Sequence, residues 1–467
     1  MTKRIIKRPR CPLRARLAII GGKISSALLK LAQGFKLPWG GTSFPGRIAL
    51  RLDPNILATL SQKYQGFILV TGTNGKTITT ALLSKLLEKA GLDIVSNSEG
   101  ANMIPGLVTA LLRAEPVLPS LFGSKYKLAV LEVDEGSLPA LSAQLCQVDM
   151  IIVTNLFPDQ LDRYGSVAAL AERMKEAFAA WPDATLVLNA DDPVVTSFGF
   201  DWSRVYYFSV ETDEPADRSK VTPCPCCGGQ LDYNSYRYAH LGSYRCSSCD
   251  FRRPQATVSL WPGSAKTRVL LARTPVEKVE LQSPLTGLYN VYNTAAALTA
   301  AFAWLPHLSL ASLAPAVASF QAPTGRTEYF LWPDKEAVLT LTKNSAGFNQ
   351  ALATLMDKKR DLAPTLIVAI NDLPADGRDI SWLEDIDSTY IPANTAIICS
   401  GRRAREVAAR FRRSHLSGQI AVISEVNRAV RSALQSSTDK IIILCNYTVL
   451  APLRRELIKQ GGKTKLG

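Results

Sequence analysis

The stretch Val70–Thr77, with the sequence Val-Thr-Gly-Thr-Asn-Gly-Lys-Thr, is the feature that most constrains the fold of this chain. Four apolar residues, Phe67–Val70, come just before its glycine turn and predict a short buried strand. After the turn, apolar residues recur at helical spacing over residues 81–90, and Gly91 is typical of a helix end. The sequence therefore predicts a strand, a tight glycine turn and a helix in direct succession, as in an α/β domain.

A glycine turn between a strand and a helix is typical of a phosphate-binding loop. Backbone N–H groups of the turn and of the helix N-terminus point at an anion, and a lysine adds positive charge. The common form of this loop starts with glycine, whereas Val70 stands at that position here, and an ordinary strand-to-helix turn is the alternative. We expect Thr77 also to reach a magnesium ion. The loop residues expected to bind the nucleotide are Gly72, Thr73, Asn74, Gly75, Lys76 and Thr77.

Charge is distributed unevenly along the chain. Lys and Arg outnumber Asp and Glu by 54 to 40, for a net charge of +14, and no acidic residue precedes Asp53. A basic arm of this kind can meet nucleic acid, anionic lipid or a phosphorylated substrate. The length of 467 residues predicts about three domains, each able to bury its own core.

The N-terminal region predicts a surface helix. No run of apolar residues reaches the roughly 18 that a membrane span needs. Residues 13–31 instead predict an amphipathic helix, broken near Gly21 and Gly22. A signal peptide is the rival interpretation, but its apolar core would be too short and further lysines follow. We expect residues 1–52 to form a basic arm, this helix and a connector, in a cytoplasmic protein that can approach the inner face of the membrane.

A second predicted strand, within Lys127–Glu135, ends in carboxylates. Open parallel sheets bind ligands at the carboxyl ends of their strands, so Glu132 can hold magnesium there, although a salt-bridged strand end is the alternative. Further strands at 149–155 and 185–189 flank a helix at about 166–180. This alternation predicts a mostly parallel sheet covered on both faces, within a central domain of residues 53–322.

Four cysteines interrupt the central domain at metal-binding spacing. They form two Cys-x2-Cys pairs separated by eighteen residues, which is typical of a structural zinc ribbon. Tyrosines between the pairs suit a hairpin too small to fold without metal, and disulfides are disfavoured because cytosolic thiols stay reduced. We expect an insert at about 221–254 in which Cys226 is a bystander. The expected zinc ligands are Cys224, Cys227, Cys246 and Cys249.

The remaining chain predicts strands over 256–282, a helix from about 288 to Trp304, and a last domain at 323–467. Asn290 and Asn293 share one face at the helix start, where amides can contact a nucleotide or cap the helix. Arg326 lies at the break between domains and can reach a γ-phosphate on domain closure. The last domain alternates strands with helices, as Rossmann-like folds do. Its strand candidates are 337–341, 365–370, 395–399, 420–423 and 440–445.

Several of these stretches together resemble one family. The compact loop resembles that of Mur ligases and folylpolyglutamate synthetases, and nearly the whole chain resembles the MurT subunits of lipid II isoglutaminyl synthase in the Mur ligase superfamily. The ribbon and the segment Ala375–Trp382 carry the most specific resemblance. The other matching segments are residues 99–102, 131–137, 159–163, 189–193, 289–293 and 343–349.

The resemblance implies an ATP-dependent ligase with magnesium and zinc. In that family the α-carboxylate of D-glutamate in the lipid II stem peptide becomes an acyl phosphate, which ammonia converts to D-isoglutamine. A separate GatD-type glutaminase supplies the ammonia and contacts the last domain, where the residue matching Asp379 completes a Cys-His pair across the interface. The resemblance thus implies catalytic roles for Lys76, Glu132 and Asp379, and nucleotide contacts for Asn293 and Arg326.

Two alternatives differ in chemistry. A Mur-type or folylpolyglutamate-like ligase that adds an amino acid is the first, but Mur ligases of that kind usually have histidine where Gln160 and Tyr289 stand. They also have a carbamylated lysine on the helix that corresponds to the one after Arg163. Lys175 lies on this helix, but its position matches that of the carbamylated lysine only loosely. A nucleic-acid-binding module is the second, but it leaves the nucleotide loop unexplained and few aromatics alternate with basic residues around the ribbon. We therefore expect no nucleic-acid partner.

Overall fold

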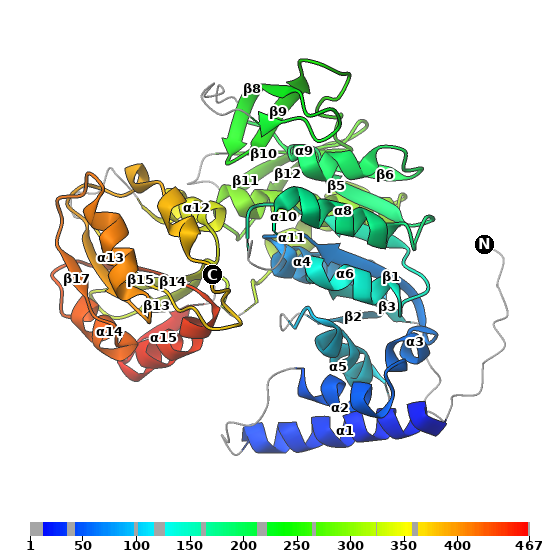
Figure 1. The fold of residues 1–467 in the computed structure, drawn as a ribbon, viewed down its shortest axis with the longest axis horizontal. Helices are drawn as coiled ribbons and strands as arrows, with labels where there is room; N and C mark the ends of the chain where they lie inside the picture. Colours follow the sequence, from blue (N-terminus) through cyan, green and yellow to red (C-terminus); the bar gives the residue numbers. More distant parts are fainter. Residues whose placement is uncertain are drawn as a thin grey trace.

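The computed structural model describes residues 13–34, 43–97, 101–115, 127–159, 165–212, 222–263, 268–323, 325–356 and 363–465. Their strands form a nine-stranded sheet, a seven-stranded sheet and a three-stranded sheet. Figure 1 shows the nine-stranded sheet in a central body, with the small sheet at one end and helix α1 at the other, while the seven-stranded sheet forms a C-terminal body beside it. The predicted α/β class, with two mostly parallel sheets and a four-cysteine insert, is confirmed. The boundaries at residues 53 and 323 stay predictions.

The central sheet has the order β12-β11-β10-β6-β5-β4-β1-β3-β2. Its pairs are parallel from β2 to β10, and the two edge strands β11 and β12 are antiparallel. The strands are β1 (Tyr64–Thr71), β2 (Ile94–Ser96), β3 (Lys127–Glu132), β4 (Met150–Val153), β5 (Thr185–Asn189), β6 (Val205–Val210), β10 (Val258–Pro262), β11 (Val269–Arg273) and β12 (Lys278–Gln282).

Helices cover both faces of this sheet, as the alternation predicted. Successive residues of β1 face opposite ways: Ile68 and Val70 belong to one buried cluster, and Phe67 and Leu69 to another. The first cluster includes α4 (Lys76–Lys89), α10 (Leu288–Trp304) and α11 (Leu310–Ala318). The second includes α3 (Ile56–Ser61), α5 (Ile104–Ala114), α6 (Leu138–Ser142), α8 (Val167–Phe178) and α9 (Pro193–Thr196).

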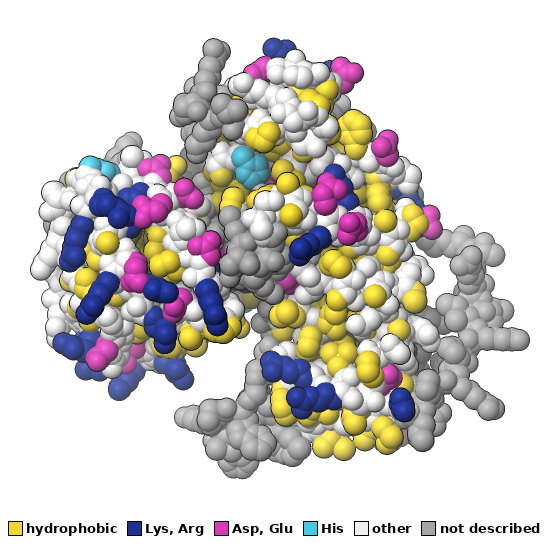
Figure 2. All heavy atoms as spheres, viewed as in Figure 1, with side chains coloured by type: hydrophobic (Ala, Val, Ile, Leu, Met, Phe, Trp, Pro, Cys, Tyr) yellow, Lys and Arg dark blue, Asp and Glu magenta, His cyan; other side chains and the backbone are white. Residues whose placement is uncertain are grey.

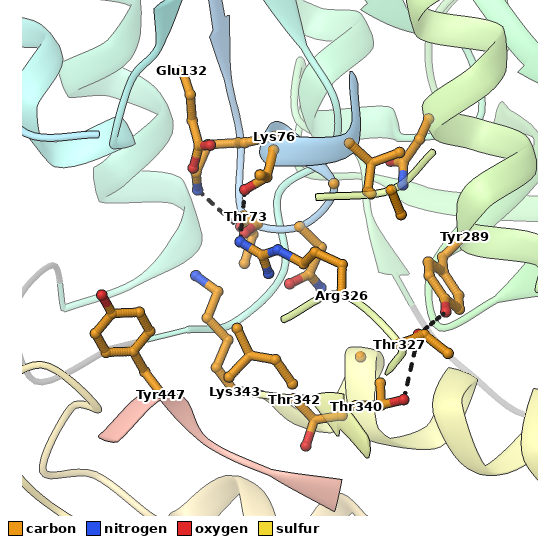
Figure 3. A pocket seen from close by; sticks show the side chains of 18 of the residues that line it. Thr73, Lys76, Glu132, Tyr289, Arg326, Thr327, Thr340, Thr342, Lys343 and Tyr447 are labelled. Atoms are coloured by element: carbon orange, nitrogen blue, oxygen red, sulfur yellow. Dashed lines mark hydrogen bonds between the residues drawn. The ribbon is translucent and has the colours of Figure 1, made fainter. Parts of the chain in front are cut away.

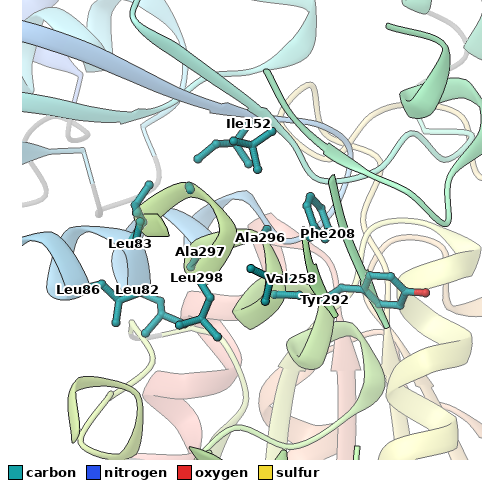
Figure 4. Packing of buried hydrophobic residues seen from close by; sticks show 14 of the residues in the cluster. Leu82, Leu83, Leu86, Ile152, Phe208, Val258, Tyr292, Ala296, Ala297 and Leu298 are labelled. Carbon is teal, nitrogen blue, oxygen red and sulfur yellow. The ribbon is translucent and has the colours of Figure 1, made fainter. Parts of the chain in front are cut away.

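The alanines of α10 let it lie close to both α4 and the sheet. Ala296 and Ala297 are fully buried. In Figure 4 they lie with Leu298 between α4, which contributes Leu82, and β10, which contributes Val258. Small side chains permit this close approach without voids. Because α4 follows the glycine turn, the packing of α10 on α4 holds the start of α4 in place.

The predicted break of the N-terminal helix is wrong: α1 (Leu13–Gly34) runs through both glycines. A Cβ atom on Gly21 would lie 2.8 Å from Leu52 Cδ1, and one on Gly22 would lie 2.6 Å from Leu112 Cδ1. The two glycines therefore allow α2 (Phe44–Leu52) and α5 to pack closely on α1 instead of ending it. Residues 44–52, expected to be part of a connector, form this helix.

None of the helices in the described ranges combines the length and the apolar character that crossing a membrane requires.

The small sheet docks on the central body through a buried carboxylate. It consists of β7 (Thr222–Pro223), β8 (Gln230–Tyr238) and β9 (Leu241–Cys246), all antiparallel. Asp191, fully buried after β5, accepts hydrogen bonds from Arg253 Nε at 2.6 Å and Tyr292 Oη at 2.7 Å. Burial raises the pKa of the Asp191 carboxyl even though the Arg253 guanidinium opposes it. The insert is thus tied to α10 and the sheet by one buried network.

The C-terminal sheet has the order β17-β16-β15-β18-β14-β13-β19, with the edge strands β13 and β19 antiparallel. The predicted strands are confirmed within one or two residues. The strands are β13 (Glu328–Leu331), β14 (Glu336–Leu341), β15 (Thr365–Ala369), β16 (Ala396–Ser400), β17 (Ile420–Val422), β18 (Lys440–Cys445) and β19 (Lys463–Lys465). The covering helices are α12 (Ser345–Leu355), α13 (Ala404–Arg412), α14 (Val426–Leu434) and α15 (Tyr447–Lys459), and short 3-10 turns are η1 (Glu135–Ser137), η2 (Ser197–Gly199), η3 (Ser381–Asp385) and η4 (Ser388–Tyr390).

Candidate active site

A cavity of about 860 Å³ lies between the central and C-terminal bodies and is lined by residues of both. Figure 3 shows Lys76 and Glu132 on its central side, Lys343 and Tyr447 on its C-terminal side, and Arg326 between them. Eight of the residues expected to bind nucleotide or magnesium line it: Thr73, Asn74, Gly75, Lys76, Thr77, Glu132, Asn293 and Arg326. Gly72 and Asp379 are not among its lining residues.

The glycine turn requires glycine at two positions. Gly72 has φ +115° and Gly75 has φ +90°, a region that other residues rarely adopt. A Cβ on Gly72 would lie 2.4 Å from Thr154 Oγ1, and one on Gly75 would lie 2.1 Å from Asn293 Oδ1. The turn is therefore pressed between the end of β4 and the start of α10, and its backbone has a single course.

Residues just after β4 hold the turn by hydrogen bonds. Asn155 accepts the Thr73 N–H through its backbone oxygen at 2.8 Å and the Asn74 N–H through its side chain at 2.9 Å. Thr154 Oγ1 donates to the Asn74 carbonyl at 2.7 Å. Asn155 is a site residue that the sequence interpretation missed, although a polar Thr-Asn pair directly after a buried strand could have indicated it.

Lys76 points into a buried cluster of charge. Its Nζ lies 2.9 Å from Glu135 Oε2 and also donates to the carbonyl oxygens of Gly72 and Thr73. Burial alone would raise the pKa of the Glu135 carboxyl, but the ammonium groups of Lys76 and Lys343 hold it below its ordinary value. Glu135 therefore remains ionised as the counterion of Lys76. Sequence reasoning chose Glu132 from this run of acidic residues and missed Glu135.

Polar contacts join the two bodies across the cavity. Lys343 Nζ pairs with Asp159 Oδ2 at 2.6 Å, and burial, which would lower the Lys343 pKa, is outweighed by Asp159 and Glu135, which raise it. The Asn74 and Asn344 amides exchange hydrogen bonds of 3.1 and 3.0 Å. Arg326 NH2 donates to Thr77 Oγ1 at 2.6 Å. These contacts hold the C-terminal body against the glycine turn.

Glu132, at the end of β3, presents a buried oxygen without a partner. Its Oε1 accepts from Asn102 Nδ2 at 3.2 Å, whereas its Oε2 has no hydrogen-bond partner among the described residues. The side chain is 2% exposed, and leaving a carboxylate oxygen unpaired there is costly. A cation in the cavity would satisfy this oxygen. The donor set, a carboxylate and the Thr77 hydroxyl lining one cavity, therefore fits magnesium.

The two asparagines of α10 form a chain of amides behind the turn. Asn293 Nδ2 donates to Asn290 Oδ1 at 3.0 Å, and Asn290 Nδ2 donates to the Thr286 carbonyl at 2.7 Å. This arrangement fixes the Asn293 side-chain oxygen against Gly75. Tyr289, one turn before Asn293, lines the cavity, and its hydroxyl oxygen lies 3.5 Å from Thr327 Oγ1. Asn290 thus acts at the helix start, and Asn293 supports the turn.

The four predicted zinc ligands come together at the end of the insert. Their sulfur atoms lie within 4.8 Å of one another, with Cys224–Cys249 at 3.8 Å and Cys227–Cys246 at 3.5 Å. A tetrahedral ion with Zn–S distances of about 2.3 Å needs sulfur separations of about 3.8 Å, so the cluster can hold zinc. A hydrogen bond from the Ser248 N–H lowers the pKa of the Cys246 thiol to about 7. Cys226 is exposed and outside the cluster, as expected.

Other expected residues lie elsewhere or outside the described ranges. Asp379 lies in the loop after β15, outside the cavity, where its carboxylate accepts the Ser381 N–H at 2.8 Å. Lys175 is a surface residue paired with Glu172 at 2.9 Å and does not line the cavity. Residues 160–163, which include Gln160, and residues 98–100 lie outside the described part of the chain.

Comparison with known proteins decides the family. The family model for the Mur ligase middle domain matches residues 70–223, and the model for the MurT ligase C-terminal region matches residues 341–450. The MurT subunit of lipid II isoglutaminyl synthase (glutamine-hydrolyzing) from Staphylococcus aureus is 31% identical over 435 residues, which cover 91% of this chain and 95% of that protein. The subunit of the same name from Streptococcus pneumoniae is 32% identical over 457 residues, which cover 95% of this chain and 97% of that protein. The chain belongs to the MurT family of Mur ligases.

Solved structures agree in fold. A pseudomurein peptide ligase type C from Methanothermus fervidus matches with a TM-score of 0.68 and 23% identity, covering 86% of this chain and 80% of that one. MurF ligase from Thermotoga maritima, solved in complex with ADP, matches with a TM-score of 0.58 and 13% identity over 88% of this chain and 85% of that one. At these identities the likeness concerns the fold alone.

Family membership makes this chain a ligase and implies ATP and magnesium as its cofactors. The MurT relatives are named as subunits, which implies that a partner protein completes the enzyme. The four-cysteine cluster adds a site that can hold zinc.

The Lys76–Glu135 pair predicts a pH-dependent loss of stability. Replacing Glu135 by Gln leaves a buried ammonium without its counterion and should destabilise the protein by about 3 kcal/mol near neutral pH. Because the folded-state pKa of Glu135 lies below its ordinary 4.5, its contribution is present above that pH and is lost as pH falls through the folded value. The Tm difference between wild type and Glu135→Gln, measured over a pH series, should therefore shrink below about pH 4.5.

A matched control is Glu172→Gln, because Glu172 forms an exposed pair with Lys175. Its effect on Tm should be small at every pH. A Tm difference for Glu135→Gln that is absent at neutral pH, or that grows as the solution is acidified, would contradict the assigned ion pair.

Proposed function

We propose that this chain uses ATP to amidate the α-carboxylate of D-glutamate in the stem peptide of lipid II, producing D-isoglutamine during peptidoglycan biosynthesis. The carboxylate oxygen attacks the γ-phosphorus, ADP leaves, and an acyl phosphate forms. Ammonia then attacks the acyl carbon, phosphate leaves with the bridging oxygen, and a proton is released. The observation that carries this proposal is the convergence of the phosphate-binding turn, Glu132, Arg326 and Lys343 on one cavity, in a chain whose relatives are named lipid II isoglutaminyl synthase subunits.

The basic residues of the cavity provide the phosphate contacts in this proposal. The N–H groups of the turn and the Lys76 ammonium hold the β- and γ-phosphates, and Lys76 exchanges its internal carbonyl partners for phosphate oxygens while Glu135 keeps it charged. Arg326 NH2 donates to Thr77 Oγ1 at 2.6 Å, so its guanidinium is already beside the turn. Asn293 positions the turn for the nucleotide. Their common task is to stabilise the charge that develops on phosphoryl transfer.

Thr77 and Glu132 hold the magnesium ion in this proposal. The unpartnered buried oxygen of Glu132 supports this assignment. A bound magnesium ion would neutralise charge on the phosphate oxygens and orient them for in-line attack.

Contacts between the two bodies protect the acyl phosphate from water. Lys343 and Asn344 come from the C-terminal body and bond Asp159 and Asn74 of the central body, beside the turn. An acyl phosphate reacts with any nucleophile that reaches it, so excluding water favours ammonia. The exposed, ion-paired position of Lys175 disfavours the alternative of an amino-acid-adding ligase with a carbamylated lysine in its cavity.

The partner in this proposal is a GatD-type glutaminase that docks on the loop carrying Asp379. The half-exposed carboxylate lies outside the ATP cavity, which suits a residue that orients a histidine of another protein. The reaction takes place in the cytoplasm at the inner face of the membrane, where a lipid-linked substrate is accessible. Zinc bound by the four cysteines stabilises the insert.

A direct assay distinguishes amidation from amino-acid addition. With lipid II, ATP and magnesium, ammonium should stimulate phosphate release and a panel of amino acids should not, and mass spectrometry should detect the amide. Lys76→Met should lower this rate at least about a hundredfold because it removes a charge that stabilises the transition state. Lys89→Met, at the far end of the same helix, should leave the rate unchanged. Strong stimulation by one amino acid, with none by ammonium, would favour the alternative ligase.

The role of Asp379 predicts a split between two nitrogen sources. In the complex with the glutaminase, Asp379→Asn should abolish glutamine-dependent amidation and leave ammonium-dependent amidation at the wild-type rate. Asp385→Asn, an exposed neighbour, should retain both activities. Equal loss of both activities in Asp379→Asn would instead place this carboxylate in the ligase reaction.

The metal site predicts different behaviour for two cysteines of the insert. Cys246→Ser removes a thiolate of the cluster, so the purified variant should lack zinc and unfold at a lower temperature than the wild type. Cys226→Ser should retain zinc at the wild-type level, because that side chain is exposed outside the cluster. Elemental analysis and thermal unfolding measure both effects, and a zinc content lowered equally in the two variants would contradict the ligand set.

A further inference from the structure

Helix α1 exposes an apolar stripe where a surface helix is normally polar. Leu17, Ile20 and Ile24 recur at a spacing of three and four residues and are 53%, 54% and 57% exposed. The opposite side of α1, which includes Ala15 and Ala18, is buried against the central body. A helix that packs one side on a protein ordinarily turns charged or polar residues toward water on the other. The outward face of α1 instead presents three large aliphatic side chains.

The stripe extends onto α2. The Cβ position of Gly21 lies 2.8 Å from Leu52 Cδ1, so Leu52, itself 46% exposed, borders the stripe. Phe44, at the other end of α2, is 39% exposed. Figure 2 shows hydrophobic side chains along the lower edge of the molecule over α1, with Lys and Arg beside them. A contiguous exposed apolar patch of this kind marks a binding surface.

Most charged residues near the stripe are basic, although Glu115 interacts electrostatically with Lys23 of α1. The first 52 residues contain twelve Lys and Arg and neither Asp nor Glu. Arg14, Arg47 and Arg51 are exposed on α1 and α2. Positive charge on one rim complements anionic lipid headgroups, whereas it would repel the same face of a second copy. An aliphatic stripe with basic flanks is the composition of a helix that lies in a membrane interface.

We propose that α1 and α2 dock this chain on the surface of an anionic phospholipid bilayer, with Leu17, Ile20, Ile24 and Leu52 inserted at the headgroup boundary. This inference rests on the proposed function, because it explains how the cavity of this chain reaches a substrate that is anchored in a membrane. Arg47 of α2 and Ser43, which directly precedes this helix, line the cavity. Arg47 and Leu52 are five residues apart on one helix, a rise of about 7.5 Å. Docking through Leu52 therefore brings the cavity to the headgroup layer, where the peptide of such a substrate lies.

Vesicle co-sedimentation of the full chain tests the docking surface. Wild type should bind phosphatidylcholine vesicles that contain phosphatidylglycerol and should bind pure phosphatidylcholine vesicles much more weakly. The triple variant Leu17→Gln, Ile20→Gln, Ile24→Gln keeps good helix formers and should lower the partition constant at least about a hundredfold. The matched control Phe200→Gln, Val276→Gln, Ile458→Gln replaces three exposed apolar residues elsewhere and should bind as wild type does.

Two further measurements separate this inference from the proposed function. ATP affinity of the triple variant should equal that of wild type, which shows that the fold is retained. Both proteins should amidate a stem-peptide substrate without its lipid at the same rate, and only wild type should gain rate when the lipid-linked substrate is placed in vesicles. The docking surface is overturned if the triple variant still binds vesicles. It is also overturned if light scattering shows that wild type is a dimer and that the triple variant is a monomer. Failure of wild type to amidate either substrate overturns the proposed function instead.

Discussion

The turn between β1 and α4 has no room for a side chain at two of its positions, and the arrangement of the cavity depends on this constraint. Gly72 would meet Thr154, and Gly75 would meet Asn293, if either carried a Cβ atom. Contact on both sides restricts the backbone to one conformation, and a hydrogen bond donated by Thr154 and one accepted by Asn155 hold it there. N–H groups that must bind a phosphate are effective only when they are oriented before the ligand arrives. Close packing thus provides the preorganisation that the proposed reaction requires.

The two lysines that line the cavity are both paired without a ligand. Glu135 holds Lys76, and Asp159 holds Lys343, so each ammonium has a carboxylate within 3 Å. A nucleotide phosphate that enters such a site meets cations whose desolvation has already been offset within the fold. The pairs also connect the two bodies. Lys343 of the C-terminal body pairs with Asp159 of the central body, and its charge helps to lower the pKa of Glu135. The same electrostatic cluster therefore lies at the proposed phosphate site and at the contact with the C-terminal body.

Local patterns in the sequence were sufficient to predict those parts of the structure that depend on residues close together along the chain. The strand, turn and helix at 64–89 and the cysteine cluster follow from spacing, and both are as expected. The break expected at Gly21 and Gly22 was wrong because its physical reason lies in Leu52 and Leu112, which the helix meets only in three dimensions. The choice among the acidic residues after β3 likewise depends on η1, which turns Glu135 toward Lys76. Pairing between residues far apart, such as Asn74 with Asn344, has no signal in a single sequence.

The cysteine insert is physically continuous with the phosphate-binding turn. Tyr238, at the end of β8, lines the cavity and packs on Phe157 with ring centroids 5.6 Å apart. His240, in the adjoining hairpin turn, meets the same ring edge-on at 5.1 Å. Phe157 in turn donates its N–H to Thr73 Oγ1 at 3.0 Å. A packed interior transmits displacement because it has few voids to absorb it. The hairpin that the cysteines close therefore supports Thr73 through Phe157, and its conformation bears on the turn that would bind the nucleotide.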